Sequence, residues 1–355
     1  MMQNEARRPG IEVGIYTFGD LGVDPQTGKT IHIQQRLQEV LAAAKLADEA
    51  GLDIFGVGEH HRLDYAVSSP AVVLAAVAQN TKRIKLSSAT TVLSTIDPVR
   101  LFEDFATLDL LSNGRAEIIA GRGAFVESFP LFGYKLSDYD ELFEEKIQLL
   151  QQVNVNEIVN WHGQFRSSLR DAMIAPRPAQ EKLPIWIGVG GTPESAIRAG
   201  RLGTGMALAI LGGDPIRFKP LVDMYRQAGA EAGHPNEDLK VAVTGHAYIA
   251  KTSQQAKDEF YPYYANYWGY VNEQRGMGTK MSRSDFEHMA GPETGLFVGS
   301  PQQIIEKILH QHELFGHQRF IAQMDIGGLS FSKVAEGIEM LATEVAPVVR
   351  RETSK

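Results

Sequence analysis

The sequence predicts an α/β fold, a (β/α)8 TIM barrel, and three observations support this prediction. Eight short runs of β-forming residues alternate with helical patterns along the whole chain. The helical patterns carry apolar stripes that a sheet can cover. The length, 355 residues, is one that an α/β barrel reaches as a single domain. We therefore expect one domain over residues 1–355, with its active site at the carboxyl ends of the strands.

The first half of the chain gives the clearest element boundaries. Strands are expected at 11–17, 52–58, 83–91 and 115–121. The helix after the first strand should end at Gly51, and its apolar stripe consists of Ile33, Leu37, Val40, Leu41 and Ala44. The helix after the third strand begins with Asp97 as its cap and Pro98 at its first position, and the run 112–114 ends it.

The second half supplies four more strands and two interruptions. The strands are expected at 184–190, 205–210, 240–250 and 318–326. Residues 156–180 predict an inserted hairpin followed by a proline-rich connection. Residues 269–295 are polar and rich in glycine and follow the seventh strand, so we expect a mobile lid over the catalytic face.

Composition excludes several function classes. The net charge is −8 without a basic block, which argues against nucleic-acid or anionic-membrane partners. There is no cysteine, so disulfides, iron–sulfur clusters, thiolate zinc sites and a cysteine nucleophile are excluded. No export signal is recognised, and the longest apolar run, 71–78, is far shorter than a membrane span. We expect a cytoplasmic protein that binds neither nucleic acid nor membrane.

A glutamate and two histidines follow the second strand, where a barrel places catalytic groups. Adjacent residues of an extended chain point to opposite sides, so His60 and His61 rarely share one metal ion. The first strand also lacks the His-x-His pattern of metal-dependent hydrolase barrels. We therefore favour a catalytic or cofactor-touching His60 over a purely structural histidine, and we expect no metal site.

The loop after the fifth strand predicts an anion site. Gly190 and Gly191 precede a helix that starts at Thr192 and Pro193. The free amides of the first turn, together with the positive end of the helix, would bind a phosphate; the residues concerned are Glu194 and Ser195, with Arg198 one turn further on. An ordinary capped barrel helix is the alternative reading.

Two further stretches belong to the same end of the barrel. Arg122, with Gly123 beside it, follows the fourth strand and could reach the same anion, unless it is a surface arginine in a turn. The third strand ends in small residues, Ser88, Ala89 and Thr90, which could lie against a flat cofactor ring or simply form a tightly packed layer.

An aromatic run, 261–270, could line an apolar substrate pocket, although such runs more often serve packing.

Taken together, three motifs resemble the bacterial luciferase-like flavin-dependent monooxygenase family, in a non-luminescent form. They are "EHH" after the second strand, the segment 87–123, and "GGTPESA" after the fifth strand. The resemblance covers nearly the whole chain and implies a barrel with one FMN at its mouth. It also implies that the strand-three bulge at Ala89, often a non-proline cis peptide in the family, supports the flavin ring.

The resemblance implies roles for single residues as well. Arg122 would hold the flavin phosphate, Glu194 and Ser195 would donate amides to it, and His60 would be the catalytic histidine. Arg198 stands where luciferase has a threonine contact. Gly121 stands where luciferase has a reactive cysteine beside the flavin.

The function implied is oxygenation of a small organic substrate by reduced FMN and O2 through a flavin C4a-hydroperoxide. No dinucleotide fingerprint is present, so a separate NAD(P)H flavin reductase is expected to supply the reduced flavin. A homodimer is expected, packed through the helices at 70–79 and 97–111. The alternatives are a deazaflavin-dependent oxidoreductase, a flavin-binding protein with little catalysis and, weakest, a metal-dependent hydrolase.

Overall fold

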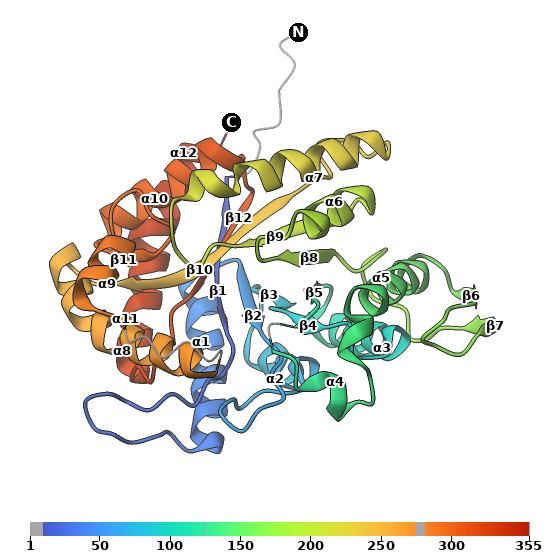
Figure 1. Ribbon diagram of the computed structural model, residues 1–355, viewed down its shortest axis with the longest axis horizontal. Helices are drawn as coiled ribbons and strands as arrows, with labels where there is room; N and C mark the ends of the chain where they lie inside the picture. Colours follow the sequence, from blue (N-terminus) through green and yellow to red (C-terminus); the bar gives the residue numbers. More distant parts are fainter. Residues whose placement is uncertain (1–9, 124, 275–280, 355) are drawn as a thin grey trace, which may run out of the picture.

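Eight parallel strands close into a barrel in the computed structural model, which describes residues 10–123, 125–274 and 281–354 (Figure 1). The strands are β1 (Glu12–Thr17), β2 (Ile54–Val57), β3 (Lys85–Ser88), β5 (Ala116–Gly121), β8 (Ile185–Val189), β9 (Gly205–Ala209), β10 (Val241–Ile249) and β12 (Arg319–Gln323). Each pairs with the next in chain order, and pairing of β10 with β9 and β12 closes the ring. The predicted barrel and all eight predicted strands are confirmed.

Helices surround this barrel in the alternating order that the sequence predicted (Figure 1). They are α1 (Ile33–Ala50), α2 (Pro70–Asn80), α3 (Pro98–Ser112), α4 (Ser128–Leu131), α5 (Tyr139–Val155), α6 (Pro193–Arg201), α7 (Lys219–Glu231), α8 (Ser253–Gln274), α9 (Arg283–Met289), α10 (Pro301–Phe315), α11 (Phe331–Met340) and α12 (Ala346–Thr353), with single turns at Leu136–Asp138, Pro215–Phe218 and Leu341–Val345. No described helix is both long enough and apolar enough to cross a membrane.

The residues predicted to begin and end helices α1 and α3 do so in the structure. The Asp97 carboxylate accepts hydrogen bonds from the amides of Val99 and Arg100, which caps α3. The same helix ends at Asn113, which adopts the left-handed conformation with φ of 58°. Gly51 ends α1 with φ of 87°, a backbone conformation that favours glycine.

Strand alternation divides each barrel strand between two cores. One side packs against the surrounding helices, and the other fills the barrel interior. The interior cluster consists of Tyr16, Ile54, Ile119, Trp186, Ala207, Ala242 and Ile321. On each strand, the interior residue two positions before this cluster lies at the base of the barrel, and the one two positions after it lies at the mouth.

The base of the barrel is closed by a network of charged side chains. The Arg319 guanidinium donates to Glu12 at 2.7 Å and to Glu117 at 2.6 Å, and it stacks over the Trp186 ring at 4.4 Å. Lys85 adds a bond to Glu12 at 2.5 Å. Burial alone would raise the pKa of Glu12, but the charges of Arg319 and Lys85 outweigh it and hold that pKa below its usual value. The network is therefore fully paired.

The two interruptions have regular structure. Residues 156–180 contain the predicted hairpin, in which β6 (Ile158–Trp161) pairs antiparallel with β7 (Leu169–Met173). The segment 269–295 is more helical than its composition indicated, because it holds the end of α8 and all of α9, which a Ser282–Asp285 capping box starts. Residues 275–280 of the predicted lid lie outside the described residues.

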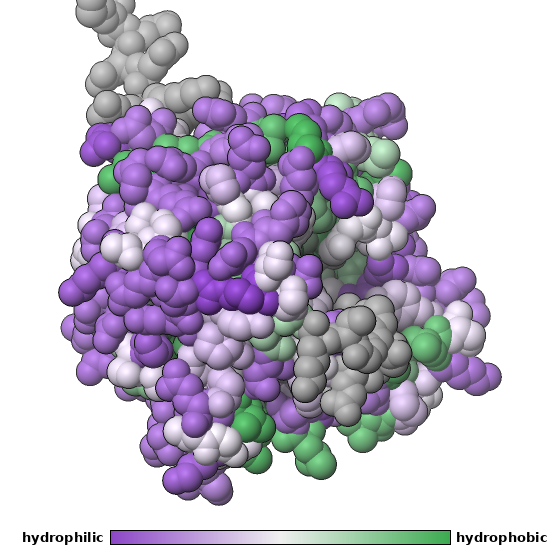
Figure 2. All heavy atoms as spheres, turned by 60° about the vertical axis from the view of Figure 1, so that its left-hand side comes forward, coloured by the Kyte–Doolittle hydropathy of each residue, from purple (hydrophilic) through white to green (hydrophobic). Residues whose placement is uncertain are grey.

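Two short strands were not separated or predicted from the sequence. β4 (Thr91–Val92) continues from β3 and pairs with β5, while β11 (Phe297–Gly299) pairs with the end of β10. The outer surface over α8, α9, α10 and α11 is mainly hydrophilic (Figure 2). The helices on this side therefore pack their apolar faces inward on the barrel.

Candidate active site

The candidate site lies at the carboxyl ends of the barrel strands. Figure 1 shows α4, α8 and the loops that follow β1 and β2 together along the lower side of the barrel. These segments all follow the ends of parallel strands, so they surround one opening, which we call the mouth.

His60 is enclosed by aromatic rings at the end of β2. Its imidazole stacks on Tyr65 with centroids 4.1 Å apart, and Phe18 and Phe125 approach to 4.6 and 5.5 Å. Only 8% of the residue is exposed, and Nδ1 has no hydrogen-bond partner. Burial lowers the pKa of His60 to about 4, so the ring is neutral near pH 7. A neutral imidazole with a free nitrogen can accept or donate one proton.

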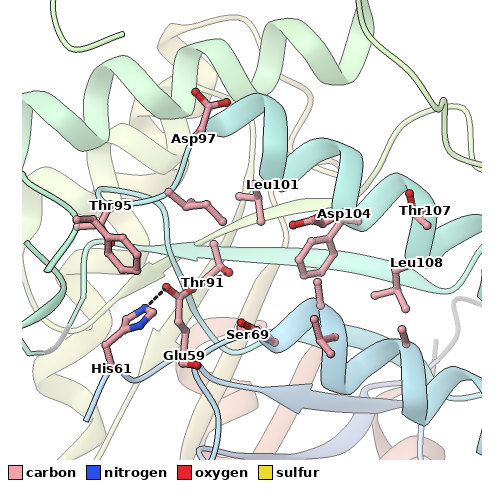
Figure 3. Close-up of a pocket in the computed structure, with 18 of the residues that line it drawn as sticks. Glu59, His61, Ser69, Thr91, Thr95, Asp97, Leu101, Asp104, Thr107 and Leu108 are labelled. Atoms are coloured by element: carbon pink, nitrogen blue, oxygen red, sulfur yellow. Dashed lines mark hydrogen bonds and ion pairs between the residues drawn. The ribbon is translucent and has the colours of Figure 1, made fainter.

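The neighbours of His60 point elsewhere, as the extended backbone predicted. Glu59 accepts hydrogen bonds from the Thr91 hydroxyl, the Val92 amide and His61 Nε2, the last at 2.8 Å. Glu59 and His61 line a cavity of about 720 Å³ between α2 and α3 (Figure 3). His60 and His61 therefore belong to different environments.

Small residues form one half of the mouth. The peptide bond between Ala89 and Thr90 is cis, as the family resemblance implied. A Cβ on Gly56 would lie 2.8 Å from the Ala89 Cβ, and one on Gly188 would lie 3.1 Å from the Thr90 Cγ2. Glycine is needed on the neighbouring strands because Ala89 and Thr90 approach them so closely. The result is a floor of small residues across β2, β3, β5 and β8.

Gly121 belongs to this floor and has a specific steric reason to be glycine. A Cβ at this position would lie 2.5 Å from Thr90 Oγ1, well inside van der Waals contact. A cysteine, which luciferase carries at the matching position, does not fit here while Thr90 keeps its place. Ser88, also predicted to line the floor, is fully buried, and its hydroxyl bonds to the backbone of Ile119 at 2.9 and 3.0 Å.

Arg122 meets the start of α6, as the two glycine-rich motifs indicated. Its Nη2 donates to Ser195 Oγ at 3.0 Å and reaches Thr192 Oγ1 at 3.4 Å, while Nη1 pairs with Asp140 at 2.5 Å. Gly123 follows it with φ of 94°. A guanidinium, two hydroxyls and a helix amino end therefore converge on one place.

The loop before α6 is open. A Cβ on Gly190 or Gly191 would meet no atom within 4 Å. Glu194 is exposed in the first turn of the helix. The Ser195 amide, predicted to be a free donor, donates to the Thr192 carbonyl at 3.1 Å, so its part in phosphate binding would require this bond to be exchanged. There is thus space beside the helix start for a ligand group.

Arg198 is engaged away from this helix start. Its Nε donates to Glu144 of α5 at 2.6 Å, and its guanidinium lies over the Phe143 ring at 5.4 Å. The contacts present hold Arg198 in the α5–α6 interface, so its predicted part in phosphate binding would require a rearrangement.

The opposite half of the mouth is polar and was not predicted from the sequence. Tyr16, Gln323 and His246 are register partners on β1, β12 and β10, and all three continue the interior positions of their strands. Gln323 is 0% exposed and His246 is 1% exposed. The alternation Ala242, Thr244, His246 was the signal that could have placed His246 inside the barrel.

Aromatic residues of α8 cover this polar half. The rings of Tyr264 and Tyr267 lie nearly perpendicular to the His246 ring, with centroids 5.8 and 5.3 Å from it. Burial raises the pKa of Tyr65, and the neighbouring Tyr267 of α8 raises it further, so α8 lies close to the ring that stacks on His60. The aromatic run predicted to line a pocket thus lies at the mouth.

Known proteins resemble this chain in sequence over most or more than half of its length. The chain is 24% identical over 346 residues to the oxygenase component of flavin-dependent trigonelline monooxygenase from Acinetobacter baylyi, covering 91% of each chain. It is 31% identical over 211 residues to the F420-dependent glucose-6-phosphate dehydrogenase of Amycolatopsis mediterranei, covering 57% of this chain and 62% of that one.

A solved structure of the same fold contains FMN. The oxygenating constituent of 3,6-diketocamphane monooxygenase from Pseudomonas putida, a type II Baeyer–Villiger monooxygenase in complex with FMN, superposes with a TM-score of 0.77 at 20% identity, covering 95% of this chain and 98% of that chain.

The family model described as luciferase-like monooxygenase matches residues 11–318. Among the described residues, no three histidine or carboxylate side chains are grouped to hold a metal ion. The chain belongs to the luciferase-like monooxygenase family.

Proposed function

We propose that this protein is an FMN-dependent monooxygenase that uses reduced FMN and O2 to oxygenate a small organic substrate. The observation that carries the proposal is the meeting of Arg122 with Ser195 and Thr192 at the start of α6, on the same side of the barrel as the floor of small residues. A phosphate group and a flat ring are the two parts of FMN that such a pair of features fits.

The residues present fit the cofactor. Arg122, Ser195 and the open loop at Gly190 and Gly191 would hold the phosphate, because they combine positive charge, hydroxyl donors and free space. The floor at Ala89 and its glycine neighbours would support the flavin ring, because its side chains are small or absent. Reduced FMN would supply the electrons that activate O2.

The chain's own residues would shield the reaction and move a proton. The rings around His60 and the aromatic run of α8 exclude water from the mouth. His60 is neutral and buried, with Nδ1 free to exchange a proton with the substrate or the flavin. The segment 269–295, as a lid, would complete this enclosure.

The first test is titration of the protein with reduced FMN without oxygen, followed by rapid mixing with oxygenated buffer. Saturable binding and a transient absorbance species that outlives the reoxidation of free FMN are expected. Loss of reduced-FMN affinity by about tenfold or more in Arg122→Ala would support the phosphate site. Binding followed by reoxidation at the rate of free flavin would favour a flavin-binding protein with little catalysis.

The second candidate is a deazaflavin-dependent oxidoreductase. The observation that favours it is the 31% identity with an F420-dependent dehydrogenase over more than half of the chain. Hydride transfer needs no O2, so preference for F420 over FMN in the same anaerobic titration would select this function.

Two partners belong to the proposal. A separate NAD(P)H flavin reductase would supply reduced FMN, and rapid NADH oxidation by the purified chain with FMN would contradict that. A second copy would cover the groove between α2 and α3, where Val72, Leu110 and Leu111 are exposed. Sedimentation velocity tests the dimer directly.

A further inference from the structure

The polar half of the mouth contains side chains that the fold leaves without partners. Gln323 is fully buried, and neither its Oε1 nor its Nε2 makes a hydrogen bond. His246 is 1% exposed, and its Nδ1 is also unpartnered. Buried amide and imidazole atoms without partners reduce stability, so their presence side by side on neighbouring strands calls for a ligand.

Both side chains point into the barrel at its mouth. Ala242 and Ile321 lie in the interior cluster, and His246 and Gln323 follow them at even spacing on β10 and β12. Tyr16, the register partner of Gln323 on β1, is itself an interior residue. The unpartnered atoms therefore face the same space as the interior layer, at the end where barrel enzymes bind substrates.

The chemistry of this pair selects a neutral group. Burial lowers the pKa of His246 to about 4, so the imidazole carries no charge near pH 7. Arg36 is held in an ion pair with Asp325, two residues beyond Gln323, at 2.6 Å. Among the described residues, Arg36 therefore offers no free positive charge to a carboxylate, sulfonate or phosphate, whereas an amide offers a donor and an acceptor that match Gln323.

The apolar part of a ligand also has a place. Tyr264 and Tyr267 of α8 lie next to His246 with centroids at 5.8 and 5.3 Å. Tyrosine rings bury a flat hydrocarbon body while the polar pair binds its head. The pair and the two rings come from β10, β12 and α8, on the other side of the mouth from Arg122.

We propose that Gln323 and His246 form a substrate subsite that binds a neutral head with both a hydrogen-bond donor and an acceptor, such as a carboxamide or lactam, with its apolar body against Tyr264 and Tyr267. This inference rests on the proposed function, because it names the substrate class of the same mouth. It assigns the subsite to the substrate, while Arg122 and the floor of small residues would serve the cofactor.

The test uses three probes that share one ring and differ in the head: benzamide, benzoate and ethylbenzene. Binding to the whole protein without flavin is measured by ligand-observed NMR, so the result does not depend on turnover or on FMN. Benzamide is expected to bind at least about tenfold more tightly than either of the other probes. Equal binding of the three, preference for benzoate, or no binding of benzamide would overturn the proposal.

Gln323→Leu tests the residue, and Gln311→Leu is its matched control. Gln311 on α10 is also buried with both amide atoms unpartnered, but it lies outside the barrel interior. Both variants are expected to raise the melting temperature by roughly 1–2 °C, because each removes buried polar atoms without partners. Only Gln323→Leu should weaken benzamide binding, by about tenfold.

Two outcomes would overturn the assignment of Gln323 to the substrate. A lower melting temperature in Gln323→Leu would mean that the amide is satisfied within the folded protein. Unchanged benzamide binding with weakened reduced-FMN binding would mean that the amide serves the flavin. Failure of FMN binding in the wild type, with the benzamide result intact, would instead contradict only the proposed cofactor.

Discussion

The two ends of the barrel are built from the same strands but treat buried polar groups in opposite ways. At the base, Arg319, Glu12, Glu117 and Lys85 satisfy one another in a closed network. At the mouth, β12 and β10 carry Gln323 and His246 with unpartnered atoms, and β2 leads to His60 in the same state. Removing one partner of a buried charge network leaves the other charge uncompensated, whereas an unpaired buried group lowers stability unless a ligand completes it.

The largest effect expected from this comparison concerns His60 at the mouth. His60→Ala should reduce turnover by roughly 10² to 10⁴, because a positioned proton donor or acceptor is lost, while reduced-FMN affinity survives. Single-turnover product formation after mixing with O2, together with anaerobic flavin titration, measures both quantities. Unchanged turnover would remove His60 from the reaction. Nδ1 has no hydrogen bond to lose, but the variant loses the stacking on Tyr65 and leaves a cavity, so urea unfolding is measured beside the turnover.

The base should respond in the opposite way. Arg319→Met leaves Glu12 and Glu117 without their main partner, so the free energy of unfolding should fall by about 3–5 kcal/mol. Urea unfolding measures this, and Arg283→Met, which removes the exposed ion pairs with Glu287 and Asp258, should lower stability far less than Arg319→Met does. Similar losses in the two variants would show that the network at the base contributes no more than exposed ion pairs do.

The floor of small residues can be tested by filling it. Gly121→Ala should reduce the free energy of unfolding by about 1–3 kcal/mol, because the new Cβ would overlap Thr90 Oγ1. Gly190→Ala is the control, since a Cβ there meets nothing within 4 Å. The double variant Gly121→Ala with Thr90→Ala should recover part of the loss, and strict additivity would contradict the contact.

The smallest effect is a pH dependence from His246. Between pH 6.5 and about 4 the unfolded chain binds a proton at this histidine and the folded chain does not, so stability falls as the pH drops through that window. His246→Phe should lose less stability than the wild type between pH 7.5 and 5.5, by about 1–2 kcal/mol. Urea unfolding at the two pH values decides, and identical losses would show that folding does not lower the pKa of His246.

The sequence predicted the barrel because its signals are local. Asp97 with Pro98, and Gly51, mark helix ends through caps that need no tertiary contact. The start of α9 was missed although Ser282 and Asp285 form a capping box, a local signal that the glycine-rich surroundings hid. The short strand β11 carries too few residues to show a pattern.

The site residues that could be predicted are the polar and charged ones that follow a glycine or the end of a strand. Arg122 and Ser195 fall into such motifs, and the structure brings them to 3.0 Å from each other. His246 and Gln323 stand inside strands that read as ordinary alternating runs, and their missing partners are visible only once β10, β12 and α8 are assembled. Arg198 joins Glu144 because α5 folds beside α6, which no local pattern predicts.

The close approach of Thr90 to Gly121 also constrains the order in which substitutions at these two positions can be accepted during evolution. A cysteine can enter position 121 without a clash only after residue 90 has become smaller, whereas the reverse order passes through an overpacked intermediate. Related sequences with a side chain at position 121 should therefore carry a residue smaller than threonine at position 90. Which side chain can stand beside the floor thus depends on the methyl and the hydroxyl of Thr90, one strand away.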